Sequence, residues 1–159
     1  MLKPNAVAPL DVNVVDQTGS PTNLRSQLGK WVVLYFYPKD NTPGCTVEAC
    51  SFRDANSELS ALGAVVIGVS KDSAASHQKF AATHNLNFSL WSDPQHQLLE
   101  AFGAWGEKKF MGRLFMGIIR STFVINPQGI VVGAFPKVTP KDHGSEIVAF
   151  LKSKLQTET

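Results

Sequence analysis

The chain has 159 residues, of which 43% are hydrophobic and 18% are charged, and its formal net charge is +2. This length and composition suffice for one core, so we expect a single domain over residues 1–159. The small net charge, with no basic run longer than two residues, argues against a nucleic-acid-binding protein. The apolar runs are too short to cross a bilayer, so we also expect no membrane association.

Apolar segments typical of strands alternate with amphipathic segments typical of helices. The expected elements are a hairpin of Asp11–Val15 and Pro21–Leu24, a strand at Val32–Phe36, a helix from Thr42 to about Leu62, a strand at Ala64–Val69, a helix at Ser73–His84, a strand near Phe88–Trp91, a helix at Gln95–Phe102, a loop at Gly103–Gly117, a second hairpin of Ser121–Ile125 and Ile130–Phe135, and a closing helix at His143–Leu155. This order predicts an α/β fold, a thioredoxin-like sandwich with a central mixed sheet, flanking helices and an N-terminal hairpin.

One of the two cysteines stands at a predicted helix start. Thr42 is a suitable N-cap residue and Pro43 suits the first helical position, which places Cys45 in the first turn. The unpaired backbone N–H groups and the positive end of the helix dipole there favour a thiolate, the nucleophilic form of cysteine. The alternative is an unreactive thiol buried in the core.

The second cysteine, Cys50, follows five residues later. On a regular helix this spacing separates the two Cα atoms by about 8 to 9 Å, which exceeds the roughly 7 Å limit for a disulfide. If Cys45 and Cys50 pair, the first turns of the helix must unwind. Two cysteines at this spacing, behind an N-terminus (Met1 to Asn5) that lacks a signal-peptide core, predict redox or catalytic use in the cytoplasm.

Several segments together resemble a known family. Pro38-x-x-x-Thr42-x-x-Cys45 resembles the peroxidatic signature of the peroxiredoxins. The run Tyr35 to Lys39, the run Thr42 to Thr46 and the pair Ala49-Cys50 resemble the bacterioferritin-comigratory, or peroxiredoxin Q, subfamily, as do the later runs Phe102 to Lys108 and Gly117 to Ile125. The similarity extends from about Pro9 to Leu155.

The resemblance implies a thiol peroxidase that reduces hydrogen peroxide and organic hydroperoxides. Cys45 would attack the O–O bond and become a sulfenic acid, and Cys50 would condense with it into an intramolecular disulfide. A thioredoxin- or glutaredoxin-type partner would then reduce that disulfide. The subfamily also implies a monomer.

The resemblance gives roles to three more residues, and the position of Glu48, three residues after Cys45, suggests a role for that acid; each role has a structural alternative. Thr42 would place its hydroxyl on the thiolate and the peroxide, or serve only as an N-cap. Pro38 would shield Cys45, or only end the strand. Arg120 would stabilise the thiolate and the charge that develops as the O–O bond breaks, or form a surface ion pair. Glu48 would orient Arg120, or remain a solvated acid of the first turn.

Two other functions use the same cysteines. A thiol–disulfide oxidoreductase is one alternative, although the C-x4-C spacing is wide for such an enzyme, and a redox-sensing or chaperone-like binding protein is the other. We expect no cofactor and no metal, since the four histidines are scattered. Four aromatic residues are candidates for an apolar collar that favours organic hydroperoxides, or for ordinary core residues: Trp91, Trp105, Phe110 and Phe115.

Overall fold

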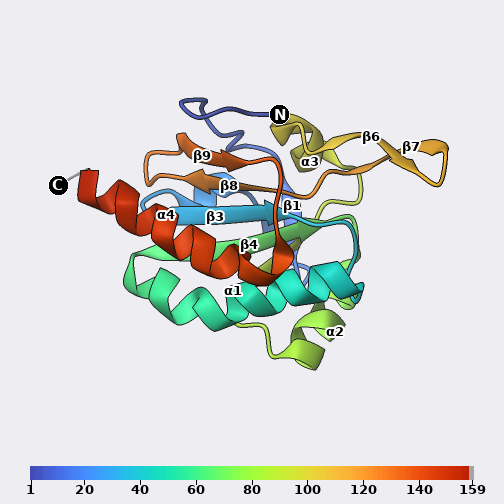
Figure 1. Cartoon of the computed structure of the whole chain (residues 1–159), viewed down its shortest axis with the longest axis horizontal. Helices are drawn as coiled ribbons and strands as arrows, with labels where there is room; N and C mark the ends of the chain where they lie inside the picture. The colour runs from blue at the N-terminus through green and yellow to red at the C-terminus, as the bar shows by residue number, and fades with distance from the viewer. Residues whose placement is uncertain (158–159) are drawn as a thin grey trace.

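A seven-stranded mixed sheet forms the centre of the computed structural model, which describes residues 1–157 (Figure 1). Its strands are β1 (Val14–Asp16), β2 (Pro21–Thr22), β3 (Trp31–Phe36), β4 (Ala64–Ser70), β5 (Ser89–Ser92), β8 (Ser121–Ile125) and β9 (Val131–Phe135), in the spatial order β2-β1-β5-β4-β3-β8-β9. Strands β3, β4 and β5 pair in parallel, whereas the outer strands pair antiparallel. The predicted central mixed sheet is confirmed.

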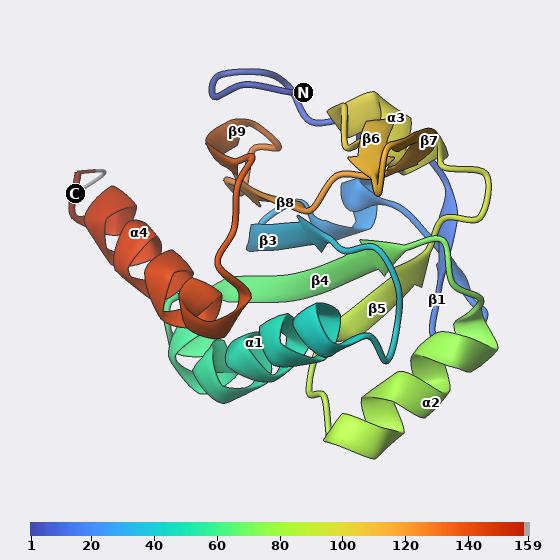
Figure 2. The same ribbon diagram turned by 45° about the vertical axis from the view of Figure 1, so that its right-hand side comes forward.

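Helices cover both faces of this sheet (Figure 2). The long helices α1 (Pro43–Ala61), α2 (Ala74–His84) and α4 (His143–Thr157) pack on one face, and the short helix α3 (Gln97–Phe102) packs on the other. Two 3-10 turns, Leu24–Gln27 and Pro140–Asp142, complete the helical elements. None of the helices in the described part of the chain is long and apolar enough to cross a bilayer.

Strand β3 shows why the sequence there is continuously apolar. Val33 and Tyr35 point into the core below α1, and Leu34 and Phe36 point into the core on the α3 side. A strand that is buried on both faces has no polar alternation. The ends of the following helix also agree with the predicted signals, because Pro43 is its first residue and Gly63, just beyond its end, has a φ of +82°.

The N-terminal hairpin exists but is shorter than predicted. Leu24, expected at the end of its second strand, instead begins a 3-10 turn, and the carboxamide of Asn23 caps this turn by accepting a hydrogen bond from the N–H of Ser26. Helix α3 likewise begins at Gln97, two residues later than expected. The carboxylate of Asp93 accepts hydrogen bonds from the N–H groups of Gln97 and Leu99 and thereby caps the helix at that point.

The loop predicted for Gly103–Gly117 is wrong, because this segment forms the hairpin of β6 (Trp105–Phe110) and β7 (Arg113–Ile118). Met111 and Gly112 connect the strands with positive φ angles of 50° and 80°, as a two-residue hairpin turn requires. The hairpin extends away from the sheet (Figure 1). The sequence shows no alternation of apolar and polar residues here, because apolar side chains near the tip of the hairpin are exposed to solvent; Phe110, for example, is 68% exposed.

Candidate active site

The loop between β3 and α1 carries Cys45 to the carboxyl edge of the parallel strands. Cys45 is the third residue of α1, and the N–H of the next residue, Thr46, donates to the carbonyl of Thr42 at 2.9 Å. Cys45 is only 1% exposed. The thiol therefore lies in a protected position in the first turn of a 19-residue helix, at the positive end of its dipole.

Thr42 occupies the N-cap position of α1, but its side chain does not cap the helix. Its backbone is extended, and the hydroxyl donates a 2.8 Å hydrogen bond to the carbonyl of Lys39. The predicted side-chain N-cap is therefore wrong. This hydrogen bond instead joins two residues of the loop that precedes α1. The hydroxyl oxygen of Thr42 can still accept a further hydrogen bond.

Arg120 reaches Cys45 from the start of β8, the strand next to β3. It precedes β8, whose first residue, Ser121, pairs with Phe36 at the end of β3. Its Nη2 atom donates a hydrogen bond of 3.2 Å to the Cys45 sulfur. Burial disfavours the charged guanidinium, but Glu48 and Cys45 outweigh this effect and raise the pKa of Arg120. The alternative of a surface ion pair does not fit, because the acid that pairs with Arg120 is fully buried.

Glu48 is that buried partner. Its side chain is 0% exposed, and Oε1 accepts from Nη1 of Arg120 at 2.5 Å. Burial raises the pKa of Glu48 to about 7 even though Arg120 acts in the opposite direction. Oε2 has no hydrogen-bond partner among the described residues. The alternative of a solvated first-turn acid is therefore wrong, and the contacts of Glu48 suit an orienting group.

Lys108 is a second cation near the site that the sequence did not indicate. It lies on β6, inside the segment predicted to be a loop, and its Nζ atom donates to the carbonyl of Ile118 at 2.8 Å. Burial and the charge of Arg120 lower the pKa of Lys108, while the nearby Cys45 acts in the opposite direction. Lys108 thus adds a second positive charge near Cys45.

Cys50 lies on the same helix as Cys45, and both thiols are free. Cys45 is buried, whereas Cys50 is partly exposed. Because α1 is continuous from Pro43 to Ala61, the two Cα atoms keep the helical separation of about 8 to 9 Å. In this state of the protein the two sulfurs cannot join without a change in the backbone.

The remaining predicted residues divide between the site and the core. Pro38 is half-buried in the loop that precedes α1. Of the four aromatic candidates, Trp91 is 2% exposed in the core, Trp105 stacks on His96 at 4.2 Å, and Phe110 and Phe115 lie exposed on the hairpin. Trp91 is therefore an ordinary core residue, the stated alternative to the collar.

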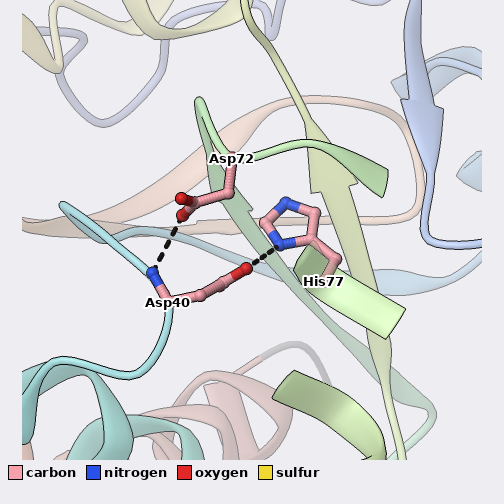
Figure 3. Close-up of side chains that lie close together, drawn as sticks. All are labelled: Asp40, Asp72 and His77. Atoms are coloured by element: carbon pink, nitrogen blue, oxygen red, sulfur yellow. Dashed lines mark hydrogen bonds and ion pairs between the residues drawn. The ribbon is translucent and has the colours of Figure 1, made fainter. Parts of the chain in front are cut away.

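A buried polar cluster beside the loop escaped the sequence analysis. Asp40, Asp72 and His77 place one ligand-type atom each within 4.8 Å of one another (Figure 3). These atoms already hold hydrogen bonds, since His77 contacts Asp40 at 2.7 Å and Asp72 accepts from the backbone N–H of Asp40 at 2.8 Å. The sequence could not indicate this group, because it depends on contacts between residues more than thirty positions apart.

Comparison with known proteins agrees with this geometry. Residues 4–134 match the AhpC/TSA family. The chain is 48% identical to peroxiredoxin Bcp of Bacillus subtilis over 142 residues, which covers 89% of this chain and 90% of the relative. It is 42% identical to peroxiredoxin Bcp of Escherichia coli K12 over 151 residues, which covers 95% and 96% of the two chains.

Solved structures agree as well. The bacterioferritin comigratory protein of Xanthomonas campestris, studied for its alkyl peroxide reduction, superposes with a TM-score of 0.87 at 40% identity and covers 94% of this chain and 98% of its own. A peroxiredoxin Q variant of Xylella fastidiosa gives a TM-score of 0.92 at 33% identity, with 98% of both chains covered. These likenesses confirm the predicted thioredoxin-like fold. The family match over residues 4–134 and the identity to these relatives over most of their length show that the chain belongs to the AhpC/TSA family and is a thiol-dependent peroxidase of the Bcp, or peroxiredoxin Q, type.

Proposed function

We propose that this peroxiredoxin reduces hydrogen peroxide and organic hydroperoxides with Cys45 as the peroxidatic cysteine and Cys50 as the resolving cysteine. The observation that carries the proposal is the single guanidinium of Arg120, which contacts both the Cys45 sulfur and the buried carboxyl of Glu48. The alkyl peroxide reduction studied in the Xanthomonas campestris relative supports the organic hydroperoxides as substrates.

In the first step, the Cys45 thiolate attacks one oxygen of the peroxide and breaks the O–O bond. The sulfur becomes a sulfenic acid, and the other oxygen leaves with the electron pair of the broken bond and takes up a proton as water or alcohol. Arg120 and the start of α1 stabilise the negative charge before and during this step. Thr42 and Pro38 shape the loop around the reacting sulfur, and Glu48 orients the guanidinium.

In the second step, the Cys50 sulfur attacks the sulfenic acid, a disulfide forms and water leaves. Cys50 is the only other cysteine in the chain, and its partial exposure supports this role. The helical separation of the two residues means that the first turns of α1 unwind before the bond forms.

A dithiol protein of the thioredoxin or glutaredoxin type then returns the disulfide to two thiols by exchange. We place the protein in the cytoplasm, because two cysteines at this spacing suit redox use in a reducing compartment. We also propose that it acts as a monomer of one domain, since Cys45, Cys50, Arg120 and Glu48 all come from one chain.

The test is stopped-flow oxidation of the reduced protein by one equivalent of hydrogen peroxide, followed by intact mass and a thiol count. We expect both thiols to disappear with a loss of about two daltons. Cys45→Ser should abolish the reaction, and Cys50→Ser should allow one round of peroxide reduction but block cycling with thioredoxin. Oxidation no faster than that of an ordinary free thiol would overturn the proposal.

A further inference from the structure

The loop that delivers Cys45 is tied down by the buried side chain of Asp40. Its Oδ1 atom accepts a 2.6 Å hydrogen bond from the hydroxyl of Tyr37, and Oδ2 accepts from Ser76 at 2.8 Å and from His77 at 2.7 Å. Asp40 is 5% exposed and Tyr37 and His77 are 0% exposed. One carboxylate therefore joins the end of β3 to the first turn of α2.

Both ring nitrogens of His77 have hydrogen-bond partners. Its Nε2 atom lies 2.9 Å from the carbonyl of Trp91, which can only accept, so Nε2 carries a proton. Its Nδ1 atom lies 2.7 Å from Oδ2 of Asp40 and 3.3 Å from the hydroxyl of Tyr37. His77 thus links Asp40 to the backbone at Trp91 (Figure 3), and this buried contact is destabilising to break because it leaves buried polar groups without partners.

The backbone of Asp40 is held from the same side. Its N–H donates to Oδ2 of Asp72, and that oxygen also accepts from the hydroxyl of Ser70 at the end of β4. The next residue, Asn41, has a positive φ of 62°, and α1 begins two residues later at Pro43. The anchored residue therefore stands immediately before the segment that must unwind when Cys45 joins Cys50.

We infer that the Asp40–His77 pair is a positioning device that favours the wound form of the α1 start and thereby sets how fast Cys50 resolves the sulfenic acid of Cys45. This inference rests on the proposed function and extends it. The wound helix requires its chain to enter from one fixed position, whereas an unwound segment accepts many. Loss of the Asp40–His77 contact, the anchor of this loop, therefore destabilises the wound form more than the unwound form. This difference in free energy raises the population of the unwound form.

The resolution rate decides the fate of the sulfenic acid. In the wound form Cys45 can react with a second peroxide, which transfers one oxygen to give a sulfinic acid and leaves as water or alcohol. In the unwound form the Cys50 thiol condenses with the sulfenic acid and water leaves. The two reactions compete, so a stronger anchor slows resolution and makes the enzyme more sensitive to over-oxidation.

The test measures the two oxidation steps separately by stopped-flow fluorescence in four variants with both cysteines intact. Asp40→Ala removes the anchor. Asp40→Asn keeps a hydrogen-bonding side chain of the same shape, because an amide can accept from Tyr37 and donate to Nδ1 of His77. Tyr37→Phe removes one hydrogen bond and keeps the fold testable if Asp40→Ala is unstable. The control is Asp93→Ala, which removes an equally buried carboxylate that caps α3 without contacting the loop.

Asp40→Ala should accelerate the resolution step by about tenfold, the effect of losing a hydrogen bond to a charged group. The peroxide concentration that over-oxidises half of the protein should rise by the same factor. Tyr37→Phe should show a smaller acceleration, and Asp40→Asn should lie close to the wild type. Asp93→Ala should lower stability but leave the resolution rate unchanged.

Resolution that is equally fast or slower in both Asp40→Ala and Tyr37→Phe would overturn the inference, as would acceleration in Asp93→Ala, which would show a general loosening of the fold. These outcomes are separate from a failure of the proposed function. If wild-type protein shows no rapid oxidation or no disulfide, the proposed function fails before the anchor is tested.

Discussion

Nη1 of Arg120 lies 2.5 Å from Oε1 of Glu48, a residue 72 positions earlier in the chain, while Nη2 lies 3.2 Å from the sulfur of Cys45. One planar group therefore contacts the nucleophile with one nitrogen and a buried carboxyl with the other. Glu48 also stands one helical turn after Cys45 on α1. The position of the guanidinium therefore depends on the helix that carries the thiol.

Replacing Arg120 by lysine should slow peroxide reduction by about a hundredfold, as the loss of a preorganised donor does in other active sites. A lysine keeps the positive charge, but its single ammonium cannot reproduce the two-nitrogen contact with Cys45 and Glu48. The measurement is the second-order rate constant of Cys45 oxidation. Arg25→Lys is the matched control, because Arg25 forms an exposed ion pair with Asp11 and should not affect the rate. Full activity in Arg120→Lys would mean that charge alone suffices.

Glu48 should make the stability of the protein fall as pH rises. The pKa of Glu48 is raised from 4.5 to about 7, so between these values the folded protein keeps a proton that the unfolded chain releases. By linkage, the free energy of unfolding then decreases with pH over this window, by on the order of 3 kcal/mol for this group. Above pH 7 the loss is complete, and below pH 4.5 it is absent.

Glu48→Gln isolates this contribution, because the amide cannot titrate while its carbonyl can still accept from Arg120. Urea unfolding of both proteins at about pH 5 and about pH 8 gives the comparison. The variant should gain stability relative to the wild type at the higher pH, and other titrating groups, such as the buried His143, cancel in the difference. A stability difference that does not change with pH would contradict the raised pKa.

Local signals predicted much of the site. The apolar run of β3, with Pro43 just beyond the following loop, placed the strand end, the helix start and Cys45 correctly, since each depends on neighbouring residues. The hydroxyl of Thr42 is the exception within this stretch. The hydroxyl of a threonine at an N-cap position can either accept from a backbone N–H of the helix or donate to a carbonyl of the preceding loop. Here it donates to the carbonyl of Lys39.

The parts that escaped prediction depend on distant contacts. Asp40 and His77 meet across 37 positions, and neither residue type alone indicates this contact. The β6–β7 hairpin escaped for a different reason, since its strands are stabilised mainly by each other and by a turn at Met111 and Gly112. Without a buried face its sequence shows no alternation of apolar and polar residues, which is the signal that reveals a strand.

Gly44→Ala should separate activity from stability at this site. A Cβ at Gly44 would lie 3.3 Å from Nη2 of Arg120, so the guanidinium must shift by a few tenths of an ångström, which disturbs its contact with Cys45. We expect the rate of Cys45 oxidation to fall by about tenfold, because small misplacements of a catalytic group are costly. The free energy of unfolding should stay the same or rise by up to about 1 kcal/mol, since alanine favours the helix.

Gly144→Ala is the matched contrast to that variant. A Cβ at Gly144 would collide with the backbone carbonyl of Ser51 on α1, which cannot swing aside as an arginine side chain can. This second variant should lose about 1 to 3 kcal/mol of stability, as overpacked sites do. It leaves the contacts of Arg120 in place, so its folded fraction should oxidise at the wild-type rate. If Gly44→Ala oxidised as fast as the wild type, the contact between Arg120 and the sulfur would not limit the reaction.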